Sequence, residues 1–288
     1  MTDDPREQGP KPPFPTGESD PPGHEADLDP RADHGEESYR GFDRLKDRVA
    51  LVTGGDSGIG RAVAIAFARE GADVLVSYLS EDDDANETVR LVEEAGRRGI
   101  AVAGDIGDEG HCRALVDRTV SELGGLDVLV NNAAFQQTHD SIVDWPSDEI
   151  EFIFRSNILS FFWLCKAAVP HMKPGSAIVN SASVQAYQPS PELLPYSTTK
   201  GAIVTFTKGL AQELTPKGIR VNAVAPGPVW TPLIPMSMDP EEFGAESPTG
   251  GRPAQPAELA PPYVFLANDE SRYVSGEILA VTGGEITA

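Results

Sequence analysis

Residues 49–66 read V-A-L-V-T-G-G-D-S-G-I-G-R-A-V-A-I-A, and this stretch decides the fold. It opens with four apolar residues, which are typical of a strand buried on both faces. Glycines follow at once, at Gly54, Gly55, Gly58 and Gly60, and then an alanine-rich run that favours a helix. A strand, a glycine turn and a helix bring backbone N–H groups and the positive end of the helix against a pyrophosphate. The stretch therefore predicts a nucleotide-binding turn, in preference to an ordinary tight turn.

Beyond this stretch, strand and helix patterns alternate to the end of the chain. The expected strands cover residues 73–78, 100–104, 126–130, 177–181, 220–225 and 277–281. The expected helices cover residues 82–98, 109–123, 148–172, 194–214 and 256–267, with a weak helical pattern over 233–243. This alternation predicts an α/β fold in which a doubly wound parallel sheet, a Rossmann fold, lies between two helical layers. A second core is not apparent, so we expect a single domain.

The first 40 residues differ in composition from the rest. They hold eight prolines, eleven acidic and four basic residues, and two aromatic residues, Phe14 and Tyr39. Such a segment lacks the apolar residues that form a core. We expect residues 1–40 to be a disordered acidic tail ahead of a catalytic domain over residues 41–288.

Charge and cysteine content limit the partners and the compartment. The net charge is −22 and the pI is near 4.5, which argues against nucleic acid or an anionic membrane surface as a partner. The N-terminus has no apolar signal region, and the longest apolar run, residues 158–169, contains Lys166 and is too short to span a bilayer. The two cysteines, Cys112 and Cys165, imply no disulfide framework. Together these features predict a cytoplasmic protein without a membrane partner.

Three residues near one strand end suggest proton transfer. The strand over 177–181 leads into Ser183, and Tyr196 precedes Lys200 by four residues, which places both on one face of a helix. A phenol titrates near 10, so a tyrosine base at neutral pH needs roughly 4 kcal/mol of preferential stabilisation of the phenolate. An ammonium in a water-poor pocket could contribute to this. No cluster of histidine or cysteine suggests a metal site. The five histidines are scattered and read as surface residues: His24, His34, His111, His139 and His171.

Cofactor selectivity is not decided by the residues after the second strand. In a doubly wound sheet the ligand lies across the carboxyl ends of the strands, and there the chain reads Ser77-Tyr78-Leu79-Ser80. This run has no acid for a ribose 2′-hydroxyl and no base for a 2′-phosphate, unless Arg61 serves. Asp56 and the acidic run 81–84 would repel a phosphate, whereas Ser77 and Tyr78 could bond with either form. The choice between NAD and NADP stays open.

The pattern Thr53-Gly54-x-x-x-Gly58-x-Gly60, together with Tyr196-x-x-x-Lys200, resembles the short-chain dehydrogenase/reductase family over about residues 45–285. Residues 187–191, 226–231 and 252–256 look like a bacterial branch with a proline-rich N-terminal extension. The resemblance implies hydride transfer between NAD or NADP and a small or medium alcohol or carbonyl compound.

The resemblance also implies roles for four catalytic residues. Tyr196 gives or takes the proton, and Ser183 stabilises the developing alkoxide. Lys200 lowers the pKa of the phenol and holds the ribose hydroxyls. Asn157, a poor choice in mid-helix, would hold a water in a proton path toward Lys200.

Cofactor residues follow partly from the strand-end positions and partly from the resemblance. Asp105 would contact the adenine, although it could equally cap the next helix. The paired asparagines at 131 and 132 suggest side chains that bond with the backbone. The full set is Gly54, Asp56, Ser57, Gly58, Ile59, Gly60, Tyr78, Asp105, Ile106, Asn132, Ala133, Tyr196, Lys200, Pro226, Gly227, Val229 and Thr231.

The substrate side rests on an apolar segment, residues 229–255, which we expect to cover the site. Phe135, Gln136 and Gln185 are expected to face the same pocket, although the segment could instead form a dimer contact. The helices over 148–172 and 194–214 would pack between subunits in a homotetramer, as the resemblance implies. Two rival functions are an enoyl reductase, for which the family separates Tyr and Lys more widely, and a non-catalytic NAD(P)-binding sensor or scaffold.

Overall fold

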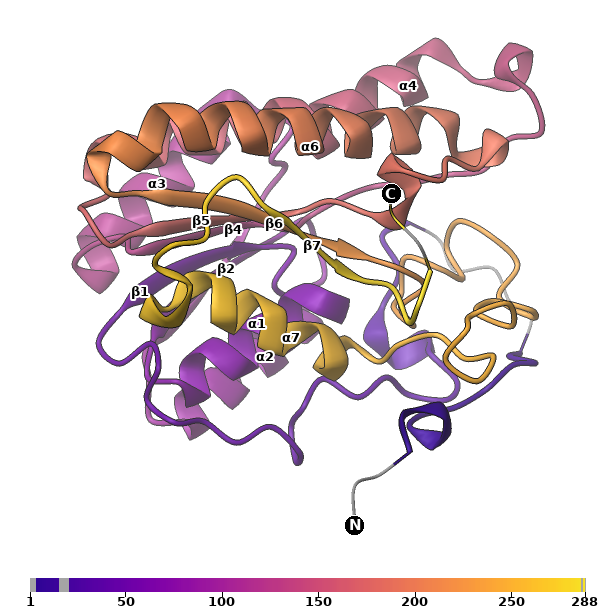
Figure 1. The fold of residues 1–288 in the computed structure, drawn as a ribbon, viewed down its shortest axis with the longest axis horizontal. Coiled ribbons are helices and arrows are strands. Elements are labelled where there is room, and N and C mark those ends of the chain that lie inside the picture. The colour runs from indigo at the N-terminus through magenta and orange to yellow at the C-terminus, as the bar shows by residue number, and fades with distance from the viewer. Residues whose placement is uncertain (1–3, 16–20, 286, 288) are drawn as a thin grey trace.

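A parallel sheet runs through the centre of the molecule (Figure 1). The computed structural model describes residues 4–15, 21–285 and 287. Among these residues the sheet has seven strands in the order β3-β2-β1-β4-β5-β6-β7, and every neighbouring pair is parallel. The strands are β1 (Val49–Thr53), β2 (Asp73–Tyr78), β3 (Gly99–Ala103), β4 (Val128–Asn131), β5 (Ala177–Ser181), β6 (Arg220–Pro226) and β7 (Ile278–Val281). This confirms the predicted fold class, and the strand order reverses between β1 and β4, where such folds bind ligands.

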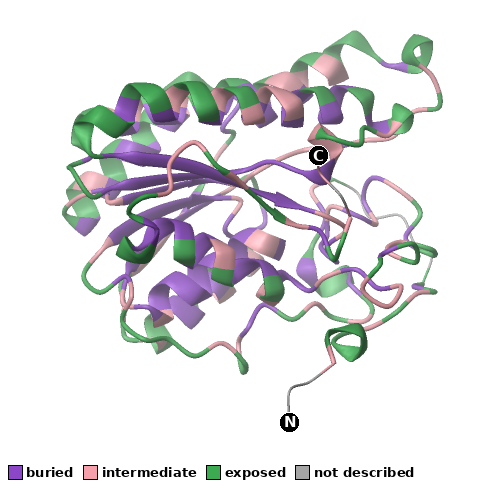
Figure 2. Ribbon diagram, viewed as in Figure 1, coloured by how far each residue is buried: buried purple, intermediate pink, exposed green. Residues whose placement is uncertain are grey.

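Helices cover both faces of the sheet (Figure 1). On one face lie α1 (Gly58–Arg69), α2 (Asp82–Glu94) and α7 (Pro256–Ala267). On the other lie α3 (Glu109–Leu123), α4 (Ser147–Phe154), α5 (Ser160–Ala168) and α6 (Leu194–Leu214). Alternate residues of β1 enter the two cores: Val52 packs with α1 and α7, and Leu51 packs with α3 and α5. A strand buried on both faces must be apolar throughout, which is why residues 49–52 read as they do (Figure 2).

Three helical expectations differ from the structure. The helix over 148–172 is interrupted by a π-helical turn, Arg155–Leu159, and ends in a 3-10 turn, Val169–His171. The helix over 82–98 ends at Glu94, because Gly96 adopts a left-handed conformation. Residues 233–243 form turns with no helix, since Pro235 and Pro240 cannot donate backbone hydrogen bonds.

One helical stretch, Ser147–His171, is long and apolar enough to cross a membrane by length and composition. Half of its most apolar window is buried inside the protein. Leu164 and Cys165 of this stretch pack in the core with α3, as expected for a core helix.

The described part of the N-terminal segment, residues 4–15 and 21–40, lies against the domain, which differs from the expected disorder. Phe14 and Leu28 are buried and form a separate hydrophobic cluster with Trp230 and Ile234. The ring of Phe14 stacks on that of Trp230 with centroids 4.2 Å apart, and the indole Nε1 donates to the carbonyl of Pro30 at 2.7 Å. A few apolar side chains are sufficient to hold the N-terminal segment because they pack against apolar side chains of the segment over 229–255.

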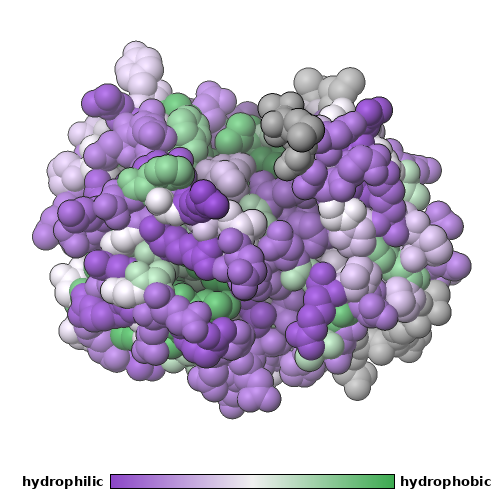
Figure 3. Space-filling view, turned by 90° about the horizontal axis from the view of Figure 1, so that it is seen from below, coloured by the Kyte–Doolittle hydropathy of each residue, from purple (hydrophilic) through white to green (hydrophobic). Residues whose placement is uncertain are grey.

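The surface over α1, α2 and α7 is mainly hydrophilic, in keeping with the acidic composition (Figure 3).

Candidate active site

The glycine turn between β1 and α1 has the geometry that its glycines allow. Gly54 and Gly58 have φ of +60° and +49°, a region that other residues rarely adopt. A Cβ on Gly60 would collide with the carbonyl of Gly54, so the helix can approach the turn only with glycine here. The glycines therefore let the start of α1 reach the cavity, which Gly58 and Ile59 line.

Asn132 ties this turn to the end of β4. Its Nδ2 donates to the carbonyl oxygens of Thr53 and Gly54, at 3.1 and 3.3 Å. The Thr53 hydroxyl accepts the N–H groups of Asn132 and Ala133, at 2.9 and 3.1 Å. The expectation that the paired asparagines bond with the backbone is therefore confirmed for Asn132 only, since Asn131 Nδ2 donates to the side chain of Asn180 at 2.9 Å. The bonds of Asn132 fix the two strand ends that flank the switch point.

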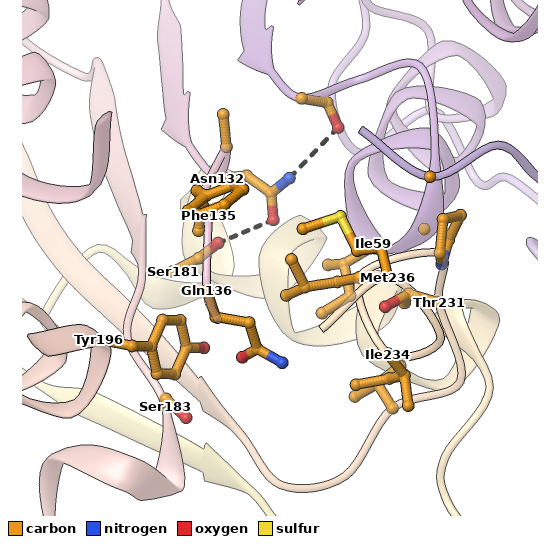
Figure 4. A pocket seen from close by; sticks show the side chains of 18 of the residues that line it. Ile59, Asn132, Phe135, Gln136, Ser181, Ser183, Tyr196, Thr231, Ile234 and Met236 are labelled. Carbon is orange, nitrogen blue, oxygen red and sulfur yellow. Dashed lines mark hydrogen bonds between the residues drawn. The ribbon is translucent and has the colours of Figure 1, made fainter. Parts of the chain in front are cut away.

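Ser183, Tyr196 and Lys200 come together at the end of β5. All three are buried, and Ser183, which lies next to Tyr196 (Figure 4), accepts the N–H of Gln185 at its Oγ at 3.1 Å. The Lys200 Nζ lies 5.2 Å from the centroid of the Tyr196 ring and donates to the carbonyl of Ser181 at 2.9 Å. Figure 4 shows Tyr196 and Ser183 on one side of the cavity, with Met236 and Ile234 across from them. The spacing in the sequence thus brings a phenol, a hydroxyl and an amine to one wall.

The protonation of this wall is governed by burial. Burial raises the pKa of Tyr196 to about 12, and the hydrogen bond with Ser183 opposes this rise. Burial lowers the pKa of Lys200 to about 7. Thus the protein alone does not produce the acidic phenol expected from the sequence, since either charge by itself is poorly solvated here. A phenolate and an ammonium formed together would offset each other's desolvation.

Asn157 lies beside this wall in the π-helical turn, but its side chain is already engaged. Its Oδ1 accepts the N–H of Phe135 and its Nδ2 donates to the carbonyl of the same residue, both at 2.8 Å. A further bond reaches Thr199 Oγ1 at 3.3 Å. The side chain thereby fixes the loop after β4, a task that the sequence does not indicate, and its water-holding role stays a prediction.

One cavity of ≈ 730 Å³ joins these parts. The predicted cofactor residues line it, apart from Gly60, and Ser183 lines it too, whereas Asn157 does not. Phe135, Gln136 and Gln185 also face this cavity, as expected. Asp105 is not the cap of α3, because Asp108 accepts the N–H of His111 at 2.6 Å. Its Oδ1 accepts the N–H of Gly107 instead, and the residue lies at the cavity.

Several residues at the site had no signal in the sequence. The Ser181 hydroxyl bonds with Asn132 Oδ1 at 3.0 Å and with the hydroxyl of Tyr263 at 2.6 Å. The Oε1 of Glu25 accepts the N–H of Gly58 at 2.5 Å and bonds with His34 Nε2 at 2.8 Å. His34 is therefore a buried residue, against the expectation for all five histidines, and its two carboxylate partners, Glu25 and Glu36, raise its pKa to about 9 in spite of burial. Only the folded chain brings these residues to the turn.

Comparison with known proteins gives the class. Residues 54–285 match the family described as Enoyl-(Acyl carrier protein) reductase. The chain is 50% identical to an uncharacterized oxidoreductase, YhdF, of Bacillus subtilis, over 91% of this chain and 92% of that protein. It is 48% identical to the glucose and ribitol dehydrogenase of Daucus carota, over 92% and 94%.

Comparison with solved structures leads to the same class of protein. A short-chain dehydrogenase from Burkholderia cenocepacia in complex with NADP has a TM-score of 0.76 and 33% identity, over 84% of this chain and 98% of that one. A 3-ketoacyl-(acyl-carrier-protein) reductase from Brucella melitensis complexed with NADH has a TM-score of 0.77 and 34% identity, over 83% and 98%. The chain belongs to the short-chain dehydrogenase/reductase family and is an NAD(P)-dependent oxidoreductase.

Proposed function

We propose that the enzyme interconverts an alcohol and its carbonyl compound, with Tyr196 as the proton donor and acceptor. The observation that carries this proposal is that the side chains of Ser183 and Tyr196 lie next to each other on the cavity wall (Figure 4), with Lys200 one helical turn behind the phenol. The two hydroxyls are placed to bond with one substrate oxygen. An oxygen that gains negative charge during reaction is stabilised by such donors.

Each residue then has a defined task. When bound, a nicotinamide cofactor supplies or accepts the hydride. Tyr196 donates its phenolic proton to the carbonyl oxygen in reduction and takes a proton from the alcohol in oxidation. Ser183 donates a hydrogen bond to the same oxygen. Lys200, when protonated, stabilises the phenolate left on Tyr196.

We place the substrate under the segment over residues 229–255. Ile234, Met236, Met238 and Phe243 line the cavity from this segment. Ser237 fixes the segment to the loop after β4, since its hydroxyl accepts Gln136 Nε2 at 2.8 Å and its carbonyl accepts Thr138 Oγ1 at 2.8 Å. The lining mixes apolar side chains with amide and hydroxyl groups, which suits a medium-sized substrate with several hydroxyls. The name of the Daucus carota relative supports the same class.

Two rival functions are less well supported. The matched family is described as an enoyl reductase, and an enoyl thioester also has a carbonyl oxygen that two hydroxyls could bind. The feature that favours carbonyl chemistry is the separation of Tyr196 and Lys200 by only four residues, which is shorter than in the enoyl reductase branch of the family. A non-catalytic sensor would not require a phenol, a hydroxyl and a lysine on one wall. We therefore favour chemistry on CH–OH groups.

We also propose that the chain assembles as a cytoplasmic homotetramer through α4, α5 and α6. Phe162 of α5 is 52% exposed, and Leu194 of α6 and Leu159, which directly precedes α5, are exposed as well. Exposed large apolar side chains are typical of a protein interface. Sedimentation should give four chains per particle; a monomer at micromolar concentration would refute this.

A panel of substrates tests the reaction. Ribitol, glucose, simple secondary alcohols and the matching carbonyl compounds are incubated with each nicotinamide cofactor, and absorbance of the reduced nicotinamide is followed. We expect turnover with at least one alcohol–carbonyl pair and none with enoyl thioesters. Turnover of enoyl thioesters alone would refute the proposal.

A further inference from the structure

Carboxylates surround the cavity at the end remote from Tyr196. Asp56 of the glycine turn and Glu81, which precedes α2, both line the cavity and are almost fully buried. Asp84 of α2 lies close behind them, and its charge and that of Glu81 raise the pKa of Asp56, although burial is the largest cause. The end of the cavity next to β2 is therefore rich in carboxylates, and the pKa of Asp56 is raised to about 7.

The N-terminal segment adds a fourth carboxylate here. Glu25 is 4% exposed and sits on the N–H of Gly58, as described above. Its own backbone N–H donates to Asp84 Oδ2 at 3.0 Å, so it belongs to the same cluster. His34 carries the balancing positive charge, but it lies on the far side of Glu25 and does not line the cavity.

Arg61 does not supply a cation to this end. Its Nε donates to the carbonyl of Asp56 at 2.7 Å, and its Nη2 pairs with the Asp84 carboxylate at 3.0 Å. The side chain is buried in these contacts. Among the described residues that line the cavity, Lys200 at the opposite end is the only cation. A 2′-phosphate near β2 would therefore meet carboxylates and no positively charged partner.

Two polar groups at this end instead suit a pair of hydroxyls. The Ser77 hydroxyl, which ends the buried part of β2 and lines the cavity, has no hydrogen-bond partner among the described residues. Asp56 lines the same end of the cavity, since it follows Gly55, whose N–H donates to the carbonyl of Ser77 at 3.2 Å. A buried hydroxyl without a partner is costly, and a ribose diol would supply both a donor to Asp56 and a partner to Ser77.

We propose that this enzyme prefers NAD(H) to NADP(H), and that Asp56 is the specificity-determining residue, aided by Glu81 and Glu25. The proposal rests on the nicotinamide-dependent activity but not on the identity of the substrate. Family membership alone does not give this preference, because one solved relative is a complex with NADP and another is a complex with NADH. The acid that the sequence lacks after β2 is provided by the glycine turn.

Binding of the two reduced cofactors tests this without any substrate. The full chain is titrated with NADH and with NADPH, and nicotinamide fluorescence gives both Kd values at fixed salt. We expect NADH to bind at least tenfold more tightly. In Asp56→Asn the preference should shrink about tenfold, through weaker NADH and tighter NADPH binding. Asp83→Asn, which removes the same charge from an exposed neighbour in α2, should leave the ratio unchanged.

The possible results of these titrations bear on different claims. Equal or tighter binding of NADPH by the unaltered chain overturns the proposal, and so does an Asp56→Asn ratio that matches Asp83→Asn. Should Asp56→Asn fail to fold, Glu81→Gln takes its place, with a smaller loss of preference expected. Absence of binding by both cofactors would refute the nicotinamide dependence itself. Preferential NADH binding without turnover of any alcohol or carbonyl would refute the proposed reaction and leave the selectivity standing.

Discussion

The two ends of the cavity are built on different principles. The end that we propose to carry the reaction, the reaction end, consists of Ser183, Tyr196 and Lys200 at the end of β5 and in α6, and neutral hydroxyls dominate it. At the opposite end, Asp56 of the glycine turn and Glu81 before α2 line the cavity, and Asp84 of α2 and Glu25 of the N-terminal segment lie behind them. Proton transfer needs atoms at fixed positions, so regular elements carry them. Repulsion of a phosphate needs only a negative electrostatic potential, and loops from distant parts of the chain can contribute to it.

The largest expected effect concerns the reaction end. Tyr196→Phe should lower kcat by about 10³-fold or more, because it removes the group that transfers the proton. Binding of the reduced cofactor should change little, since the other end is intact. Steady-state rates and fluorescence titration measure the two effects. Tyr187→Phe, which alters a tyrosine outside the cavity lining, is the matched control and should retain full activity. Comparable turnover by both variants would exclude the role of Tyr196.

The second prediction concerns the glycine turn at the carboxylate end of the cavity. Gly60→Ala should weaken binding of either cofactor about tenfold or more and destabilise the protein by about 1–3 kcal/mol, because the new Cβ meets the carbonyl of Gly54. Gly201→Ala is the control, since a Cβ at this position in α6 meets no other atom and favours the helix. Titration and thermal unfolding report both effects. Unchanged binding in Gly60→Ala would show that the close approach does not matter.

Carbonyl reduction and alcohol oxidation should depend on pH in opposite ways, because they need different protonation states of Tyr196 and Lys200. Reduction needs a neutral phenol and a charged lysine; burial lowers the pKa of Lys200 to about 7, so the ammonium is lost as pH rises above 7. We expect kcat/KM for carbonyl reduction to fall above about pH 7, since this parameter reports the free enzyme. Alcohol oxidation, which needs a proton acceptor, should rise with pH. A reduction profile that stays level to pH 10 would contradict this assignment.

The smallest expected effect lies at the N-terminal segment. Phe14→Ala removes the ring that stacks on Trp230 and should loosen the segment over 229–255. We expect the KM for substrate to rise severalfold, with little change in the Kd for cofactor. Phe42→Ala, at a ring that is 75% exposed, should change neither constant. Equal effects on substrate and cofactor would argue for general destabilisation instead.

The sheet could be predicted because its strands are buried on both faces and its helices show regular apolar spacing. The bounds of the strand over 177–181 and of the helices over 109–123, 194–214 and 256–267 agree with the structure. The π-helical turn at Asn157 could not be seen, since the apolar spacing around it reads as one continuous helix.

The contacts of the N-terminal segment were out of reach for a different reason. Proline-rich composition indicates only that a segment cannot form a core by itself. The partners of that segment lie far away in the sequence: Trp230 donates to Pro30, 200 residues earlier. For the same reason, composition suggested a surface role for His34, although the fold buries it between Glu25 and Glu36.

The segment before β1 touches both the opening of α1, through Glu25, and the cover of the substrate space, through Phe14. Exchanging it between relatives would therefore transplant two properties at once, the fit of the coenzyme and the shape of the entrance. Protein engineers who trim or replace this stretch to improve expression should expect a changed enzyme, and fusion partners are better attached elsewhere.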